Sequence, residues 1–355
     1  MRHGRVLIFR LLVILIAGFC PWVAAVRAQV TPTERVFSGT VNYKYRIQMR
    51  LRRAGKTLSG SYFYERVQQA LTLRGEIDAQ NNFILREYNS SGAQTGIFKG
   101  KWEPADCEGC GDSLNGNWSR PDGKGSLMFD LTVYAVDFRG PLKLMTRSMS
   151  EKGPKPPPQY EISLEYPQIE GSASANVARF NELIRGKASQ VASQYRADFL
   201  DRHDESDFGL TYVVGLANDD LVSVDLISCF HYDGAAQRWC YPNTINYDLK
   251  SARLIKFEEL FRPGVDYLKW FTDYSLRDLK RQFKDRRVND KQLQEGLNEM
   301  LGNEDRWLVT PEGLDLVFDS LNPSPVAVGE AHVIVPYSEM KQIIRSDGPL
   351  SAFTR

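Results

Sequence analysis

Long apolar runs are missing from the sequence after residue 28, since no later stretch approaches the roughly 20 residues that span a bilayer. Histidine is also scarce: there are four in the chain, and none has the spacing of a His-Glu-x-x-His metal motif. We therefore expect no stable membrane span, no metal site and no cofactor. These absences direct attention to binding rather than to metal-assisted catalysis.

A charge excess of one sign is missing as well. The chain holds 45 basic and 44 acidic residues, and residues 1–28 hold four of the arginines and no acid. Without that segment, 41 basic residues stand against 44 acidic ones. Proteins that bind nucleic acid carry a strongly basic surface, so we expect no nucleic-acid partner.

The first 28 residues have the pattern of a secretory signal peptide. Arginines open the segment, an apolar stretch follows over residues 11–19, and small residues precede a cleavage site near Ala28. The pattern predicts an exported protein, either periplasmic or secreted. The rest of the chain is long enough for two domains.

Four cysteines remain once Cys20 is removed with the signal segment: Cys107, Cys110, Cys229 and Cys240. An even number of cysteines in an exported protein favours disulfides. Their spacing predicts the pairs Cys107–Cys110 and Cys229–Cys240, the second across the neck of a β-hairpin. A redox motif at Cys107 and Cys110, or a zinc site using all four, are the weaker alternatives.

Residues 33–138 look like a glycine-rich all-β domain. The pattern apolar–x–Gly–x–apolar occurs five times, and turn-forming residues separate the copies. Its central residues are Gly39, Gly60, Gly75, Gly100 and Gly116. The spacing predicts an up-and-down meander rolled into a small barrel, with glycine making room for bulky neighbours. Such a barrel either packs a core or holds a small ligand, and the second case would make the protein a small-ligand carrier.

A proline-rich segment and a mixed domain complete the predicted organisation. Residues 139–159 include a Gly-Pro-Lys-Pro-Pro-Pro run and are predicted to form a linker. Residues 160–347 combine strand-like and helix-like periodicities, which predicts an α+β domain with an antiparallel sheet and packed helices. The expected helices begin near residues 174, 265 and 337.

One short motif carries a hint of catalysis. Gly-Asp-Ser-Leu at 111–114 matches a serine-esterase signature, in which a downstream aspartate and histidine activate the serine. No Asp-x-x-His occurs near the C-terminus, and the motif leads into a predicted strand. A hydrolase using Ser113 is therefore only an alternative, which requires a histidine within hydrogen-bond reach.

A basic strand is predicted over residues 43–53, where apolar and polar residues alternate. Lys44, Arg46, Arg50 and Arg52 share one face, and no acidic residue of the segment lies on it. The row is either a solvated strand face or a patch for an anionic envelope polymer or an acidic protein surface. We name these four residues as candidate binding residues.

The C-terminal half carries a series of short motifs in a recognisable order. They include Tyr-Pro-Gln-Ile at 166–169, Tyr-Pro-Asn at 241–243, Phe-Glu-Glu-Leu-Phe at 257–261 and Val-Ile-Val-Pro-Tyr-Ser at 333–338. Together they resemble a domain shared by the extracellular part of a lysozyme-sensing anti-sigma factor and by an accessory region of some peptidoglycan deacetylases. The resemblance covers most of residues 160–345.

The resemblance implies a non-enzymatic role in the cell envelope. The expected partner is a lysozyme-like protein or a cell-wall glycan such as peptidoglycan, which the protein would bind or sense. Tyr241, Pro242 and Asn243 follow the predicted hairpin and are expected near the contact surface. Members of the family commonly have histidine where this chain has Tyr241.

Overall fold

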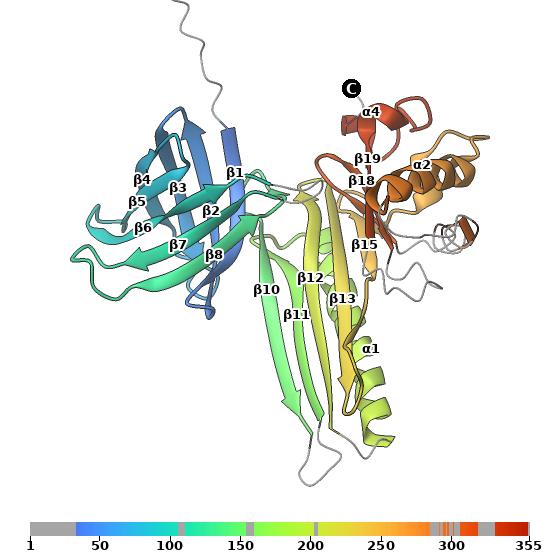
Figure 1. The fold of residues 1–355 in the computed structure, drawn as a ribbon, viewed down its shortest axis with the longest axis horizontal. Helices are drawn as coiled ribbons and strands as arrows, with labels where there is room; N and C mark the ends of the chain where they lie inside the picture. The colour runs from blue at the N-terminus through green and yellow to red at the C-terminus, as the bar shows by residue number, and fades with distance from the viewer. Residues whose placement is uncertain are drawn as a thin grey trace, which may run out of the picture.

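The computed structural model describes residues 33–105, 111–153, 160–201, 205–284, 291, 294, 295, 297, 301, 306–318 and 331–353. They form a closed barrel, a long second sheet and a small three-stranded sheet (Figure 1). The predicted α+β class is confirmed. Among the described helices, none combines the length and the apolar character that crossing a membrane would require.

The barrel is an eight-stranded antiparallel meander. Its strands are β1 (Thr33–Val41), β2 (Tyr45–Ala54), β3 (Thr57–Tyr64), β4 (Leu71–Ile77), β5 (Asn82–Tyr88), β6 (Gln94–Glu103), β7 (Ser113–Ser119) and β8 (Leu127–Val133). Pairing of β1 with β8 closes the ring. The up-and-down barrel predicted from the glycine repeats is thus confirmed.

The repeated glycines lie where neighbouring strands approach most closely. At each of the five, a Cβ would stand within 2.2 Å of a carbonyl oxygen of the adjacent strand. The sequence led us to expect bulky side chains as the neighbours, whereas the closest atom in every case is backbone. Glycine is needed here because any side chain would push the two strands apart.

Side chains fill the barrel interior. The buried cluster includes Phe37, Met49, Tyr62, Phe98 and Phe129, each no more than 1% exposed. Small barrels of eight strands have an interior just wide enough for such a core. The filled core gives no support to the small-ligand carrier considered above.

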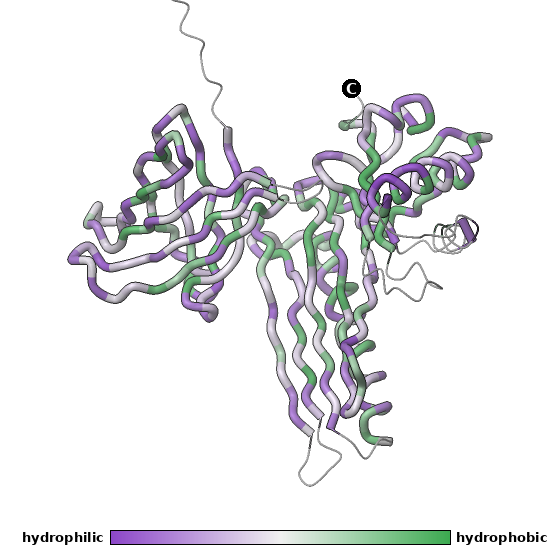
Figure 2. Tube along the Cα trace, viewed as in Figure 1, coloured by the Kyte–Doolittle hydropathy of each residue, from purple (hydrophilic) through white to green (hydrophobic). Residues whose placement is uncertain are grey.

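The second sheet is long and carries one helix. Its strands are β9 (Val136–Asp137), β10 (Lys143–Lys152), β11 (Tyr160–Glu170), β12 (Ser206–Asn218), β13 (Leu221–Tyr232), β14 (Trp239–Tyr241), β15 (Thr244–Asp248) and β16 (Arg253–Leu254). Helix α1 (Ala175–Asp201) packs on one face through a shared core that includes Phe180, Phe199 and Phe208. Hydrophilic and hydrophobic residues alternate along the long strands, as a sheet with one covered face requires (Figure 2).

The linker prediction was wrong over residues 143–152. This segment forms β10, which pairs with β11 along its whole length, from Lys143 opposite Glu170 to Lys152 opposite Glu161. Leu144 and Met145 at its start are buried, so packing and ladder bonds outweigh the nearby prolines. The proline-rich run at 154–158 lies outside the described residues.

A buried polar joint connects the barrel to β10. Gln48 Nε2 donates to Glu65 Oε1 at 2.9 Å and to the carbonyl oxygen of Leu144 at 2.5 Å. The second oxygen of Glu65 accepts from the backbone N–H of Thr146 at 3.1 Å. Gln48 and Glu65 are both buried, and these bonds satisfy the Gln48 amide nitrogen and both Glu65 oxygens. The barrel therefore holds one end of β10 through two of its own side chains.

The last part of the chain forms a small layered unit. It contains β17 (Trp307–Val309), β18 (Gly313–Phe318), β19 (Ala331–Pro336), α2 (Tyr267–Gln282), α4 (Tyr337–Met340) and the short helices η1 (Phe257–Leu260) and η2 (Ser351–Phe353). Helix α2 confirms the helix expected near residue 265, and Asp266 caps it by accepting from the Lys269 N–H at 3.1 Å. Phe257, Phe271 and Trp307 lie in its core.

Candidate functional site

The disulfide between Cys229 and Cys240 joins β13 to β14. The two cysteines are directly opposite in the antiparallel ladder, where Phe230 also pairs with Trp239. This confirms the predicted hairpin disulfide. The predicted Cys107–Cys110 pair lies outside the described residues.

An exposed aromatic stack lies on this hairpin. The ring of Phe230 stacks on Trp239 at a centroid distance of 5.7 Å and on Tyr241 at 5.9 Å. Trp239 is 36% exposed and Tyr241 is 45% exposed, although aromatic side chains of this size are usually well buried. We call Phe230, Trp239 and Tyr241 the aromatic platform.

Helix α1 packs against the platform through Tyr195. Tyr195 lies 5.1 Å from Phe230 and stacks on Phe208 at 4.3 Å between ring centroids. Burial, and then the nearby Tyr241 and Asp198, raise the pKa of Tyr195 to about 12, so its hydroxyl is neutral at physiological pH. The Tyr232 hydroxyl donates to Asp198 at 2.7 Å, which ties the hairpin to the helix.

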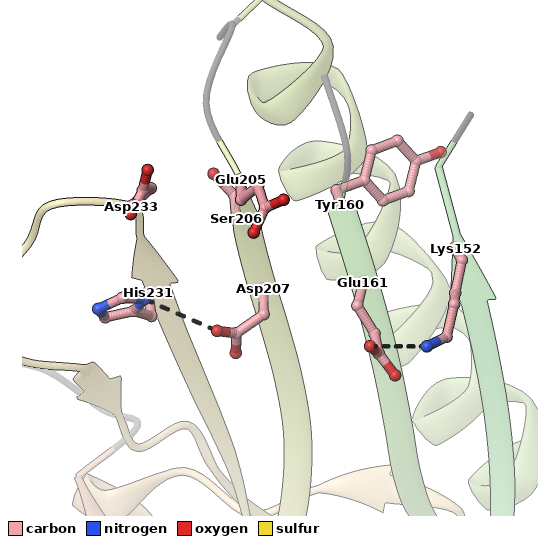
Figure 3. Close-up of a pocket in the computed structure, with 8 residues that line it drawn as sticks. All are labelled: Lys152, Tyr160, Glu161, Glu205, Ser206, Asp207, His231 and Asp233. Carbon is pink, nitrogen blue, oxygen red and sulfur yellow. Dashed lines mark ion pairs between the residues drawn. The ribbon is translucent and has the colours of Figure 1, made fainter. Parts of the chain in front are cut away.

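A polar pocket of about 240 Å³ lies at the ends of β10–β13, with its Asp207 and His231 side chains on the face of the sheet opposite α1 and the aromatic platform. Its lining residues are Lys152, Tyr160, Glu161, Glu205, Ser206, Asp207, His231 and Asp233 (Figure 3). Lys152 Nζ is 3.1 Å from Glu161 Oε2, and His231 Nδ1 is 3.8 Å from Asp207 Oδ2. Arg238 also pairs with Asp207. The pocket therefore offers both hydrogen-bond donors and acceptors to a polar ligand.

This pocket does not present a metal centre. Within the described ranges, no group of three or more His, Cys, Asp or Glu side chains is arranged to hold a metal ion. The charged groups around Asp207 and Glu161 instead neutralise one another in pairs. The arrangement suits recognition of hydroxyl and amide groups.

Two of the predicted basic-strand residues are paired with acids from elsewhere in the fold. Arg46 forms an ion pair with Glu165 of β11. Arg50 Nη1 lies 2.6 Å from Glu34 Oε1 and 3.7 Å from Asp137 Oδ1. The segment itself shows no acid on this face, but β1 and the second sheet supply several. Lys44 lies near the ring of Tyr45, with its Nζ 5.6 Å from the centroid.

Arg52 belongs to a different surface, which we call the arginine row. In register across the barrel, Arg52 faces Ser59, Ser59 faces Arg74, and Arg74 faces Arg86. All four side chains are exposed, and within the described part of the chain none of the three arginines forms an ion pair. The sequence analysis missed Arg74 and Arg86 because only strand register brings them beside Arg52.

Of the Tyr-Pro-Asn turn, only Tyr241 projects outward. Pro242 is buried, and its carbonyl oxygen accepts from Arg306 Nη1 at 2.7 Å. The backbone N–H of Asn243 donates to Asp225 Oδ1 at 2.7 Å. These two residues therefore fix the junction between the second sheet and the segment before β17.

The Ser113 motif shows no catalytic arrangement. Ser113 opens β7, and its hydroxyl oxygen accepts from Asn115 Nδ2 at 3.1 Å. Of the histidines that the structure describes, His231 lies at the polar pocket and His332 bonds to Asp315 of β18. The described geometry thus gives no support to a hydrolase built on Ser113.

Comparisons with known proteins place the C-terminal region in context. Residues 258–338 match a family described as "Protein of unknown function (DUF3298)". A curated relative, "Peptidoglycan-N-acetylmuramic acid deacetylase PdaC" of Bacillus subtilis (strain 168), is 25% identical over 116 residues, which are 33% of this chain and 25% of that protein. The predicted resemblance to peptidoglycan deacetylases is confirmed at this level.

Two solved structures of DUF3298 proteins are also similar to this chain. One, from Bacteroides fragilis NCTC 9343, has 15% identity and a TM-score of 0.42, and the match covers 61% of this chain and 98% of that one. The other, from Pseudomonas aeruginosa PAO1, has 15% identity and a TM-score of 0.40, with 58% and 94% covered.

Proposed function

We propose that this protein is an exported, non-enzymatic binding protein of the cell envelope and that its aromatic platform recognises peptidoglycan. The observation that carries the proposal is the stack of the exposed Trp239 and Tyr241 on Phe230, on a hairpin closed by a disulfide. Aromatic residues are enriched at binding surfaces.

The chemistry of the platform matches a glycan. The face of an aromatic ring is electron-rich and attracts the weakly positive C–H groups on the apolar face of a sugar ring. The disulfide and the contacts with α1 hold the rings in place, which lowers the entropy lost on binding.

The comparison with the deacetylase supports the choice of ligand. The name of that relative identifies N-acetylmuramic acid of peptidoglycan as its substrate, and the chain shares 116 aligned residues with it. The Cys229–Cys240 disulfide fits an oxidising compartment, where the cell wall is found. Both observations favour a wall component as the ligand.

Co-sedimentation with purified, insoluble peptidoglycan tests the proposal. We expect Trp239→Ala and Tyr241→Ala each to weaken binding at least about 10-fold, because a central aromatic contact contributes about 1.4 kcal/mol or more. Tyr45→Ala is the matched control, since Tyr45 lies on the barrel and is also 45% exposed. Its affinity should stay at the wild-type value.

Three results would redirect the proposal. Wild-type binding by Trp239→Ala would remove the platform from the site. Binding to an immobilised lysozyme, with none to peptidoglycan, would identify the protein partner as the ligand. Loss of binding in an Arg74→Glu, Arg86→Glu variant with an intact platform would place the contact on the arginine row and indicate an anionic polymer.

A further inference from the structure

Strand β10 is the edge of the second sheet, and its residues direct their backbone N–H and C=O groups alternately toward β11 and away from it. The N–H of Gly153 donates to the carbonyl oxygen of Tyr160 at 2.8 Å, so residues with odd numbers on β10 bond to β11. In an antiparallel ladder the intervening residues direct their N–H and C=O groups the other way. The even-numbered residues of β10 therefore point their backbone groups out of the sheet.

The barrel uses only the first part of this edge. Gln48 and Glu65 bond the outward groups of Leu144 and Thr146. The next outward groups belong to Ser148 and Ser150, both exposed, and they make no hydrogen bond with any part of the chain that the structure describes. Figure 1 shows this part of β10 running away from the barrel, with β11 on one side and no element drawn on the other.

An edge of this kind is a template for another strand. Protein edges are usually blocked by prolines, bulges or inward-pointing charges, and residues 147–152 have no proline and pair regularly with β11. Met149, at the centre of the open segment, is 45% exposed. An extended strand added here would cover Met149 and satisfy the four outward groups of Ser148 and Ser150.

We propose that the occupant is the same edge of a second copy, paired antiparallel and centred on Met149. In this register Ser148 bonds to Ser150 of the second copy, and Met149 faces its own equivalent. Arg147 then faces Glu151 of the second copy, on both sides of the two-fold axis. The segment is thus complementary to itself in charge, which favours a second copy over an unrelated peptide.

Neighbouring registers lose this complementarity. Only even-numbered residues point their backbone groups outward, and they must pair with each other. Within the open segment, the two-fold axis could therefore lie elsewhere only at Ser148 or Ser150. Either shift would place Met149 opposite Arg147 or opposite Glu151 and would separate the charges. Arg147 and Glu151 are already held by Glu170 and Arg196 respectively, so their side chains are oriented before the second copy arrives.

Cysteine cross-linking tests both the dimer and its register. In the full exported chain, Met149→Cys should give a disulfide-linked species at twice the mass of the monomer, because facing residues of a non-bonded pair have Cα atoms about 4.5 Å apart. Ser148→Cys is the matched control, since its equivalents would lie about 7–8 Å apart and should not cross-link. Mixing the Ser148→Cys and Ser150→Cys proteins should restore cross-linking.

Two further variants distinguish pairing from chance collision. Ser150→Pro removes an N–H that takes no part in the β10–β11 ladder, so the fold should persist while sedimentation shows a monomer. Arg147→Glu should also give a monomer, and adding Glu151→Arg should restore the dimer. A monomeric Met149→Cys protein under oxidising conditions, or equal cross-linking of Ser148→Cys alone, would overturn the proposal. Either result leaves the peptidoglycan assay unaffected.

Discussion

Replacing Gly75 by alanine should destabilise the barrel by about 2–4 kcal/mol. A Cβ on Gly75 would lie 1.8 Å from the carbonyl oxygen of Ile84 on β5, and real Cβ contacts essentially never fall below 3.0 Å. Strand β5 would therefore have to retreat by about 1.2 Å, which exceeds the range of distances over which a backbone hydrogen bond keeps its strength. The estimate combines overpacking, about 1–3 kcal/mol, with about 1 kcal/mol from weakened ladder bonds.

A second glycine provides the control. Gly186 lies on the exposed face of α1, and an added Cβ there would meet nothing within 4 Å. Gly186→Ala should stabilise the helix by about 0.5–1 kcal/mol, because alanine loses less conformational freedom on folding. The two substitutions add the same methyl group. Opposite effects on stability would therefore show that the close approach of the strands, and not the methyl group itself, causes the destabilisation in Gly75→Ala.

Native-state hydrogen exchange measures both effects locally. The opening free energy of amides in β4 and β5 should fall in Gly75→Ala, and that of α1 should rise slightly in Gly186→Ala. If Gly75→Ala keeps wild-type protection in β4 and β5, glycine is not required by the strand contact. The physical interpretation of the five repeats would then be refuted.

Three other perturbations have defined outcomes. Hydrogen bonds from Arg196 and then Tyr160 lower the pKa of Glu151 to about 2, so its stabilising contribution is complete above pH 4.5 and disappears as the pH falls toward 2. Because the pair is partly exposed to solvent, it contributes only about 1 kcal/mol to the unfolding free energy. Acid titration should therefore show Glu151→Gln less stable than wild type at pH 6 and equal to it near pH 2. Glu65→Ala leaves the Thr146 N–H without its acceptor, which should lower the unfolding free energy by about 2–3 kcal/mol. Limited proteolysis should then cleave β10 faster, and unchanged cleavage would contradict the role of the joint. Replacing Cys229 and Cys240 by serine should lower the unfolding free energy by about 2–3 kcal/mol in denaturant titration, and an unchanged midpoint would show that the hairpin closes without the bond.

Local patterns in the sequence predicted much of the fold. The five glycine-centred repeats indicated a small β-meander barrel, because strand periodicity and turn residues act over a few neighbouring positions. The Cys229–Cys240 disulfide was predicted for the same reason, since both cysteines flank one hairpin. The linker prediction over residues 143–152 failed because the adjacent prolines gave a strong local signal and the pairing with β11 gave none.

The candidate site was harder to predict because its parts meet through long-range contacts. Tyr241 was named from the family resemblance, but Trp239 was not, and nothing local indicated that Phe230 would stack on both. The basic strand was recognised as a row of cations, yet the acids that pair with Arg46 and Arg50 come from other strands.

The sequence alone therefore determined that residues 33–138 form a β-barrel, where glycine is required in it and which cysteines close the hairpin, because these depend on residues close together in the chain. The tertiary structure decided which charges are neutralised, that the barrel core is filled and which part of the β10 edge remains open. Those properties depend on strand register and on the contact between the barrel and the second sheet. Register and packing bring together residues that are distant in the chain, and no local pattern records them.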